Sequence, residues 1–255
     1  MKVLAVEPHG DDLLLACKSF LELDGNEIDM ITVSDRYSAN LNEEFKSIKS
    51  VEFLDYEGLG YNGGTVFLKT YVVHRDYQNK IPIYQNYLEF LMNEAYEPDQ
   101  YNKAYKKLYN SLYSRIKSSN YELILAPIGL VQPNHMLLGH VIRDIIRELA
   151  IPVLHYIEKP YIANRYCKEM YEDYKARFFD SKFYEINPGY PRIKGCNAYV
   201  EKLVRKYYPT ELRLFRFDHD ILNNYPCMYV TSDKAIYDRY VNVLSVDNFT
   251  KNHIS

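Results

Sequence analysis

The residues best suited to chemistry follow the first apolar segment of the chain, KVLAVEP. His9, Asp11 and Asp12 come directly after it. Because neighbouring carboxylates leave the backbone in different directions, one can bind a metal ion while the other handles protons. His135 lies in a second polar segment, which follows the apolar run YELILAPIG. Together the two segments supply the donors needed for metal-assisted hydrolysis.

The first segment also has a plainer structural interpretation. An Asp at the start of a helix is a good cap, and a His before it can simply fill the turn. Taken alone, HGDD favours that interpretation. A second polar segment carrying His135 after another apolar run shifts the balance towards a metal site.

The elements that must position these residues alternate between strands and helices. This order predicts an α/β, Rossmann-like three-layer fold with a mostly parallel sheet flanked by helices. Sites in such sheets form beyond the carboxyl ends of the strands, so we expect His9 and His135 to share one crevice. Strand patterns occur at 2–8, 27–35, 51–57, 121–129 and 151–161, and helical spacings at 12–23, 42–51, 98–118 and 137–149.

The two motifs resemble those of the PIG-L/LmbE family of zinc-dependent N-acetylglucosaminyl deacetylases. That family reads His-Pro-Asp-Asp-Glu after its first strand and His-x-Asp-His after a later one, where this chain has HGDDL and QPNH. The resemblance includes the strand order and the downstream segment EKLVRKYYPTELRLF, so it spans most of the chain. It implies Zn²⁺, or another divalent metal such as Fe²⁺, held by His9, Asp12 and His135, with Asp11 as the catalytic base.

The implied activity is removal of an N-acetyl or other short N-acyl group from an amino-sugar conjugate. Three protein ligands leave a fourth zinc position open, as in catalytic rather than structural sites. Zinc lowers the pKa of a bound water to about 7. Asp11 would accept the proton of that water and return it to the leaving amine.

Four positions depart from the family pattern. Gln132 and Asn134 replace a His and an Asp, while Gly10 and Leu13 replace a Pro and a Glu. Gln132 can still donate a hydrogen bond to the oxyanion, but a neutral hydrogen bond is roughly half as strong as a charge-assisted one. These changes leave open an alternative: a non-catalytic glycan- or nucleotide-binding protein that retains the deacetylase fold and metal ligands.

Two other patterns compete with the hydrolase interpretation. The ligand set also matches the two-histidine, one-carboxylate triad of non-haem iron oxygenases. Those enzymes usually place it on an antiparallel jelly roll, whereas strands and helices alternate here.

Gly58, Gly60 and Gly63 have dinucleotide-loop spacing, but a β-branched, aromatic run follows them, which predicts a flexible turn and hairpin. The alternative is that this segment forms part of a substrate lid near the first-strand site.

Four tyrosines recur every fourth residue between 101 and 113. A basic aromatic helix could stack nucleobases. A packed stripe on an amphipathic helix explains the spacing more simply. The four are Tyr101, Tyr105, Tyr109 and Tyr113. Among the other histidines, His140 and His155 have the pattern of packed residues, while the polar neighbours of His74 and His219 suit a pocket without defining a role.

Composition limits the class of protein. The chain has 255 residues, of which 47% are hydrophobic and 25% charged, with a net charge of -3. We expect one domain over 1–255, with an insertion around 60–100 and a substrate-facing portion from about 158. Residues 158–217 carry 13 Lys and Arg against 8 Asp and Glu, which suits an anionic substrate group or a solvated basic face.

The same composition predicts the surroundings of the protein. Four scattered cysteines without a C-x-x-C pair fit neither a disulfide scaffold nor a cysteine-rich zinc site. The first residues do not resemble a signal peptide, and no segment reaches the roughly 20 apolar residues of a membrane span. We therefore expect a cytoplasmic protein whose partner is a small-molecule N-acetylated sugar conjugate, with no nucleic acid and no membrane span.

Overall fold

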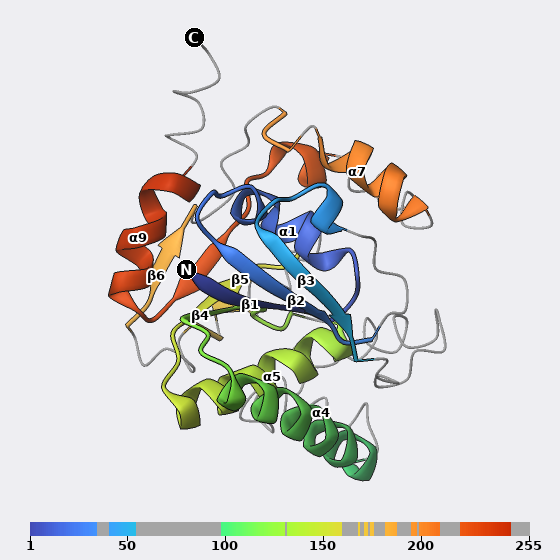
Figure 1. Cartoon of the computed structure of the whole chain (residues 1–255), viewed down its shortest axis with the longest axis vertical. Helices are drawn as coiled ribbons and strands as arrows, with labels where there is room; N and C mark the ends of the chain where they lie inside the picture. Colours follow the sequence, from blue (N-terminus) through green and yellow to red (C-terminus); the bar gives the residue numbers. More distant parts are fainter. Residues whose placement is uncertain are drawn as a thin grey trace.

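A mixed, mostly parallel sheet forms the centre of the protein (Figure 1). The computed structural model describes residues 1–34, 41–54, 98–130, 132–159, 168, 171–172, 174–175, 182–187, 195–197, 199–209 and 220–245. Its strands are β1 (Lys2–Glu7), β2 (Glu27–Thr32), β3 (Ile48–Phe53), β4 (Leu123–Pro127), β5 (Val153–Tyr156), β6 (Tyr184–Ile186) and β7 (Tyr229–Thr231). Its helices are α1 (Asp12–Leu21), the 3₁₀ helix η1 (Leu41–Glu43), α4 (Pro98–Ser118), α5 (Pro133–Leu149), α7 (Val200–Tyr207) and α9 (Lys234–Leu244).

The strand order is β3-β2-β1-β4-β5-β7-β6. The first five strands pair in parallel, whereas β7 pairs antiparallel with both β5 and β6. Helices α4 and α5 cover one face of the sheet, and α1 and α7 lie on the other (Figure 1). The α/β fold with a mostly parallel sheet is therefore confirmed.

Strand β1 shows how the sheet joins two hydrophobic cores. Val3 and Ala5 pack into the core beneath α1, while Leu4 and Val6 pack into the core beneath α4 and α5. Successive side chains of a strand point to opposite faces, so a strand covered on both faces is apolar throughout. The continuous apolar run that begins the sequence follows from this double burial.

The helix expected over 42–51 is wrong. Only the short η1 occurs there, and the chain then enters β3 at Ile48, which pairs in parallel with β2. In β3, only Ile48 is fully buried, while Lys49, Ser50 and Phe53 are exposed. Because an edge strand with a wet face contains charged and polar residues, its pattern can imitate the spacing of an amphipathic helix.

The tyrosine stripe is confirmed as a packing feature of α4. The rings stack along the helix, and their hydroxyl groups reach across to polar side chains of α5. This arrangement satisfies polar groups at the helix interface. The four hydrogen bonds are Tyr101 Oη with His140 Nδ1 (2.7 Å), Tyr105 to Asp144 Oδ2 (2.5 Å), Tyr109 to Glu148 Oε2 (2.6 Å) and Tyr113 to Glu148 Oε1 (2.5 Å).

Two glycines allow α5 to approach the end of β4 closely. Gly129 has a φ of +95°, and a Cβ there would lie 3.0 Å from the backbone oxygen of His135. A Cβ on Gly139 would lie 2.8 Å from the backbone oxygen of Ile128. Since both obstacles are backbone atoms, neither can move aside cheaply. The two glycines thus fix where the first turn of α5 meets the sheet.

Several expectations fall on other parts of the chain. The glycine-rich turn at 58–63, most of the expected insertion at 60–100, His74 and His219 lie outside the described residues. Within the described residues, no helix combines the length and apolar character needed to cross a membrane.

The close approach at Gly139 generates a test of the fold. In an unobstructed helix, Gly→Ala stabilises by about 1 kcal/mol. Here the new methyl group would collide with the backbone of Ile128, which follows β4. We therefore expect Gly139→Ala to lower the free energy of unfolding, measured in urea, by about 1–3 kcal/mol. An increase in the free energy of unfolding would contradict the packing described.

Candidate metal centre

The candidate site lies at the point in the sheet where the strand order reverses, between β1 and β4. Strands β1 and β4 are neighbours, with Val3 opposite Leu123, yet β1 continues into α1 on one face and β4 continues into α5 on the other. Crevices at such switch points, beyond the carboxyl ends of parallel strands, are the usual ligand sites of open α/β sheets. His9 and His135 enter this crevice from its two sides.

A tight turn after β1 fixes Asp12. The backbone N–H of His9 donates to Oδ2 of Asp12 (2.9 Å), and the N–H of Asp12 donates to the backbone oxygen of His9 (3.2 Å). Asp12 is the first residue of α1 and is buried, with 6% exposed. The carboxylate of Asp12 is therefore held in place by the turn from His9 to Asp12.

His135 lies in the first turn of α5, not in the loop where the sequence placed it. The helix begins at Pro133, four residues earlier than expected. Oε1 of Gln132 accepts from the N–H groups of Asn134 (2.6 Å) and His135 (3.2 Å) and so caps the helix. Proline at the first helical position needs no such partner, and Gln132 is a less usual cap than Ser or Asp, which is why the sequence pattern missed this turn.

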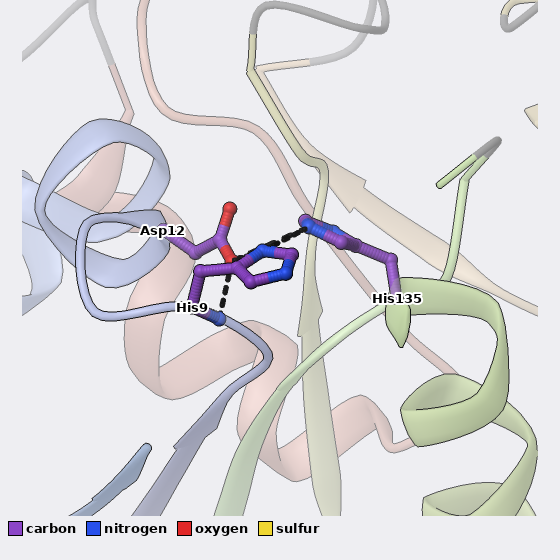
Figure 2. Close-up of side chains that lie close together, drawn as sticks. All are labelled: His9, Asp12 and His135. Atoms are coloured by element: carbon purple, nitrogen blue, oxygen red, sulfur yellow. Dashed lines mark hydrogen bonds and ion pairs between the residues drawn. The ribbon is translucent and has the colours of Figure 1, made fainter. Parts of the chain in front are cut away.

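Three buried donor atoms converge in the crevice (Figure 2). His9 Nδ1 and His135 Nε2 each lie 3.3 Å from Asp12 Oδ2, and the two nitrogens lie 3.3 Å apart. Tetrahedral zinc with ligand bonds of about 2.0–2.1 Å requires ligand separations of about 3.3–3.4 Å. The triangle therefore has the dimensions of one face of a zinc coordination sphere.

The pKa values of two carboxyl groups near the triangle, Asp12 and Glu7, are shifted in opposite directions. Burial pushes the pKa of Asp12 upward, but His135 and His9 outweigh it and hold that pKa below its ordinary value. Burial raises the pKa of Glu7 well above its ordinary value, although Leu13 and Thr32 donate hydrogen bonds to it. The surroundings thus favour the charged form of Asp12, the form that binds a cation, whereas burial favours the neutral form of Glu7.

Asp11 precedes α1 and is half-buried. Although it occupies the cap position, its side chain makes no capping hydrogen bond to the first turn of this helix. The N–H of Leu13 instead donates to Oε2 of Glu7 (2.9 Å). The capping role offered by the plainer interpretation of HGDD is therefore taken over by a different residue.

The two amides that depart from the family pattern both lie against His9. Nε2 of His9 is 3.4 Å from Nε2 of Gln132 and 3.3 Å from Nδ2 of Asn134. This ring nitrogen lies opposite the one that faces Asp12. Asn134, which the sequence left without a task, is buried beside a proposed ligand and contacts its outer nitrogen.

Sequence reasoning missed two buried acids. Glu7 lies at the end of β1, and Glu158 lies two residues beyond β5 with Oε1 3.4 Å from Nδ1 of His135. Each is a single acid at the end of an otherwise apolar strand. That position was the available signal, because acids are almost never fully buried unless paired.

Comparisons with known proteins support the fold. No protein-family model matches the sequence, and no curated protein matches it. Two solved structures of the deacetylase in the biosynthesis pathway of teicoplanin are similar. The "deacetylase-bog complex" has a TM-score of 0.51 at 14% identity and covers 92% of this chain and 100% of that one. The deacetylase-teicoplanin complex has a TM-score of 0.50 at 13% identity with the same coverage. At this identity the likeness shows the fold alone.

The ligand triangle generates a test of metal binding. We expect the purified protein to retain zinc and His135→Ala to lower zinc retention by at least about tenfold, because one of three donors is lost. Elemental analysis after dialysis measures the zinc content of each protein. His140→Ala is the matched control, since His140 is on the same helix but its contacts are with Tyr101 and Asp144. Equal zinc content in both variants would exclude His135 as a ligand.

Proposed function

We propose that the protein is a zinc-dependent N-deacetylase that removes an N-acetyl or other short N-acyl group from an amino-sugar conjugate. The observation that carries this proposal is the buried triangle of His9 Nδ1, Asp12 Oδ2 and His135 Nε2, with sides of 3.3 Å. The motif resemblance and the shared fold of the teicoplanin deacetylases support the choice of amide hydrolysis.

Three ligands from one face of the metal leave room for water and substrate on the other. A bound zinc ion would lower the pKa of water to about 7 and polarise the substrate carbonyl. Asp11, adjacent to the ligand Asp12 but outside the triangle, accepts a proton from the attacking water. As the C–N bond breaks, Asp11 returns this proton to the leaving nitrogen, and the products are an amine and a carboxylate.

Gln132 is positioned to stabilise the developing oxyanion. Its Oε1 is occupied by two backbone N–H groups of α5, so its NH₂ group must point the other way, towards His9. If Nδ1 of His9 binds the metal, the imidazole proton is on Nε2, and that nitrogen cannot accept a hydrogen bond. The N–H groups of Gln132 are then available to a substrate oxygen.

Zinc is the metal we propose, with Fe²⁺ as the alternative. Neutral imidazoles and one carboxylate suit either ion. The mostly parallel sheet is unlike the antiparallel jelly roll usual for two-histidine, one-carboxylate oxygenases, which favours hydrolysis over oxygen chemistry. For the partner we propose a small-molecule N-acetylated sugar conjugate, on the resemblance alone.

The role of Asp11 can be separated from metal binding. We expect Asp11→Asn to keep its zinc and to lose at least about 100-fold in kcat, because an amide cannot accept the proton. Amine release from N-acetylated sugars and zinc content are measured on the same sample. Asp24→Asn, an exposed Asp beyond α1, is the control. Full activity in Asp11→Asn would end this mechanism.

The second candidate function is a non-catalytic glycan- or nucleotide-binding protein. The amides at Gln132 and Asn134 favour it, because a neutral pair stabilises an oxyanion less than a charged one. If this chain is an adapted enzyme, Gln132→His with Asn134→Asp should change kcat/KM by less than about tenfold. A rise of several hundredfold from near-zero activity would instead identify a binding protein. Thermal unfolding of the double variant checks that α5, which loses its cap, still forms.

A further inference from the structure

Glu158 lies directly behind His135. The two ring nitrogens of His135 face opposite groups: Nε2 faces the ligand triangle, and Nδ1 is 3.4 Å from Oε1 of Glu158. Both side chains are fully buried, each with 0% exposed. The imidazole is therefore enclosed between the proposed metal position and a carboxylate from the segment that follows β5.

This arrangement selects one tautomer of His135. A neutral imidazole has a single N–H, and a nitrogen that binds a metal must keep its lone pair. A carboxylate only accepts hydrogen bonds, so the proton of the imidazole is favoured on Nδ1, the nitrogen that faces Oε1 of Glu158. Nε2 is then left free for the ion, which is how carboxylates support metal-bound histidines.

Glu158 is itself held in place by the loop that follows β4. The backbone N–H groups of Gly129 and Leu130 donate to its Oε1 at 2.7 and 2.9 Å. The same loop leads into Gln132 and α5. One oxygen of Glu158 thus links the end of β5, the exit of β4 and the ring of His135, which gives the carboxylate a fixed direction.

The other oxygen of Glu158 lowers the stability of the fold when no cation is bound. Oε2 is buried and has no hydrogen-bond partner among the described residues. A buried carboxylate whose hydrogen bonding is incomplete destabilises a protein unless a compensating charge lies nearby. A divalent cation across the imidazole of His135 supplies such a charge.

We propose that Glu158 is a positioning residue that fixes the tautomer of His135 and strengthens its binding of the metal. This inference rests on the proposed metal site and adds to it a residue that the sequence motifs do not contain. Glu158 touches no other member of the triangle in the hydrogen bonds and ion pairs of the described residues.

The test measures zinc affinity in Glu158→Gln by competition with a chromophoric chelator. The amide oxygen can still accept from Gly129 and Leu130, so the loop is preserved while the charge is lost. We expect the dissociation constant for zinc to rise about 10–100-fold. Glu185→Gln is the control: a partly buried acid on β6 that accepts hydrogen bonds from Tyr171 and Lys175 and does not contact His135. We expect its zinc affinity to stay within about threefold of wild type.

A second readout needs no metal. Long-range ¹H–¹⁵N spectra of the metal-free wild-type protein should show His135 protonated at Nδ1, and Glu158→Gln should reduce the population of that tautomer. Wild-type His135 protonated at Nε2, or unchanged zinc affinity in Glu158→Gln, would overturn the role of Glu158. If the wild-type protein binds no zinc at all, the proposed function fails, and the tautomer still decides whether Glu158 orients the ring.

Discussion

The site depends on the hydrogen-bonded pairing of β1 with β4. This parallel pair brings two segments more than 100 residues apart in the sequence to the same edge of the sheet. The chain leaves the two strands towards opposite faces, into α1 after β1 and into α5 after β4 (Figure 1). The turn after β1 and the start of α5 are therefore held a few ångströms apart by the sheet itself, and His9 and His135 need no mobile loop to meet.

The price of this arrangement is polar burial near the sheet. Glu7, Asp12 and Glu158 are all buried, and each sits at or just beyond the carboxyl end of a strand or at the first turn of a helix. Backbone N–H groups of Leu13, His9, Gly129 and Leu130 donate to them. Such donors offset part of the desolvation of a buried acid, since charge-assisted hydrogen bonds are the stronger kind. A cation at the proposed metal site would reduce the remaining cost of burying Asp12 and Glu158.

The sequence predicted those strands and helices whose pattern of apolar residues is compatible with only one kind of element. Strand β1 is apolar because both of its faces are buried, and α4 has the expected bounds because its stripe packs on α5. The expectation was partly right for β3: a strand was expected over 51–57, but the exposed edge removes the apolar signal at its first residues, which were assigned to a helix. No strand was expected at β6 or β7, which are only three residues long. His9, Asp12 and His135 could be grouped from residue type and strand order. Glu7 and Glu158 were missed: their position at the end of apolar strands was a signal, but the sequence does not show that such a single acid is buried.

Gln132 combines two tasks in one side chain. Its oxygen closes the first turn of α5, and its nitrogen faces the crevice beside His9. A substitution at 132 that improves turnover would thus also alter how the helix begins, and one that strengthens the helix start would withdraw a donor from the crevice. With the proposed role of Gln132, this position would be constrained by folding and by chemistry at once. Only amino acids with an acceptor and a donor on a side chain of this reach would then meet both constraints.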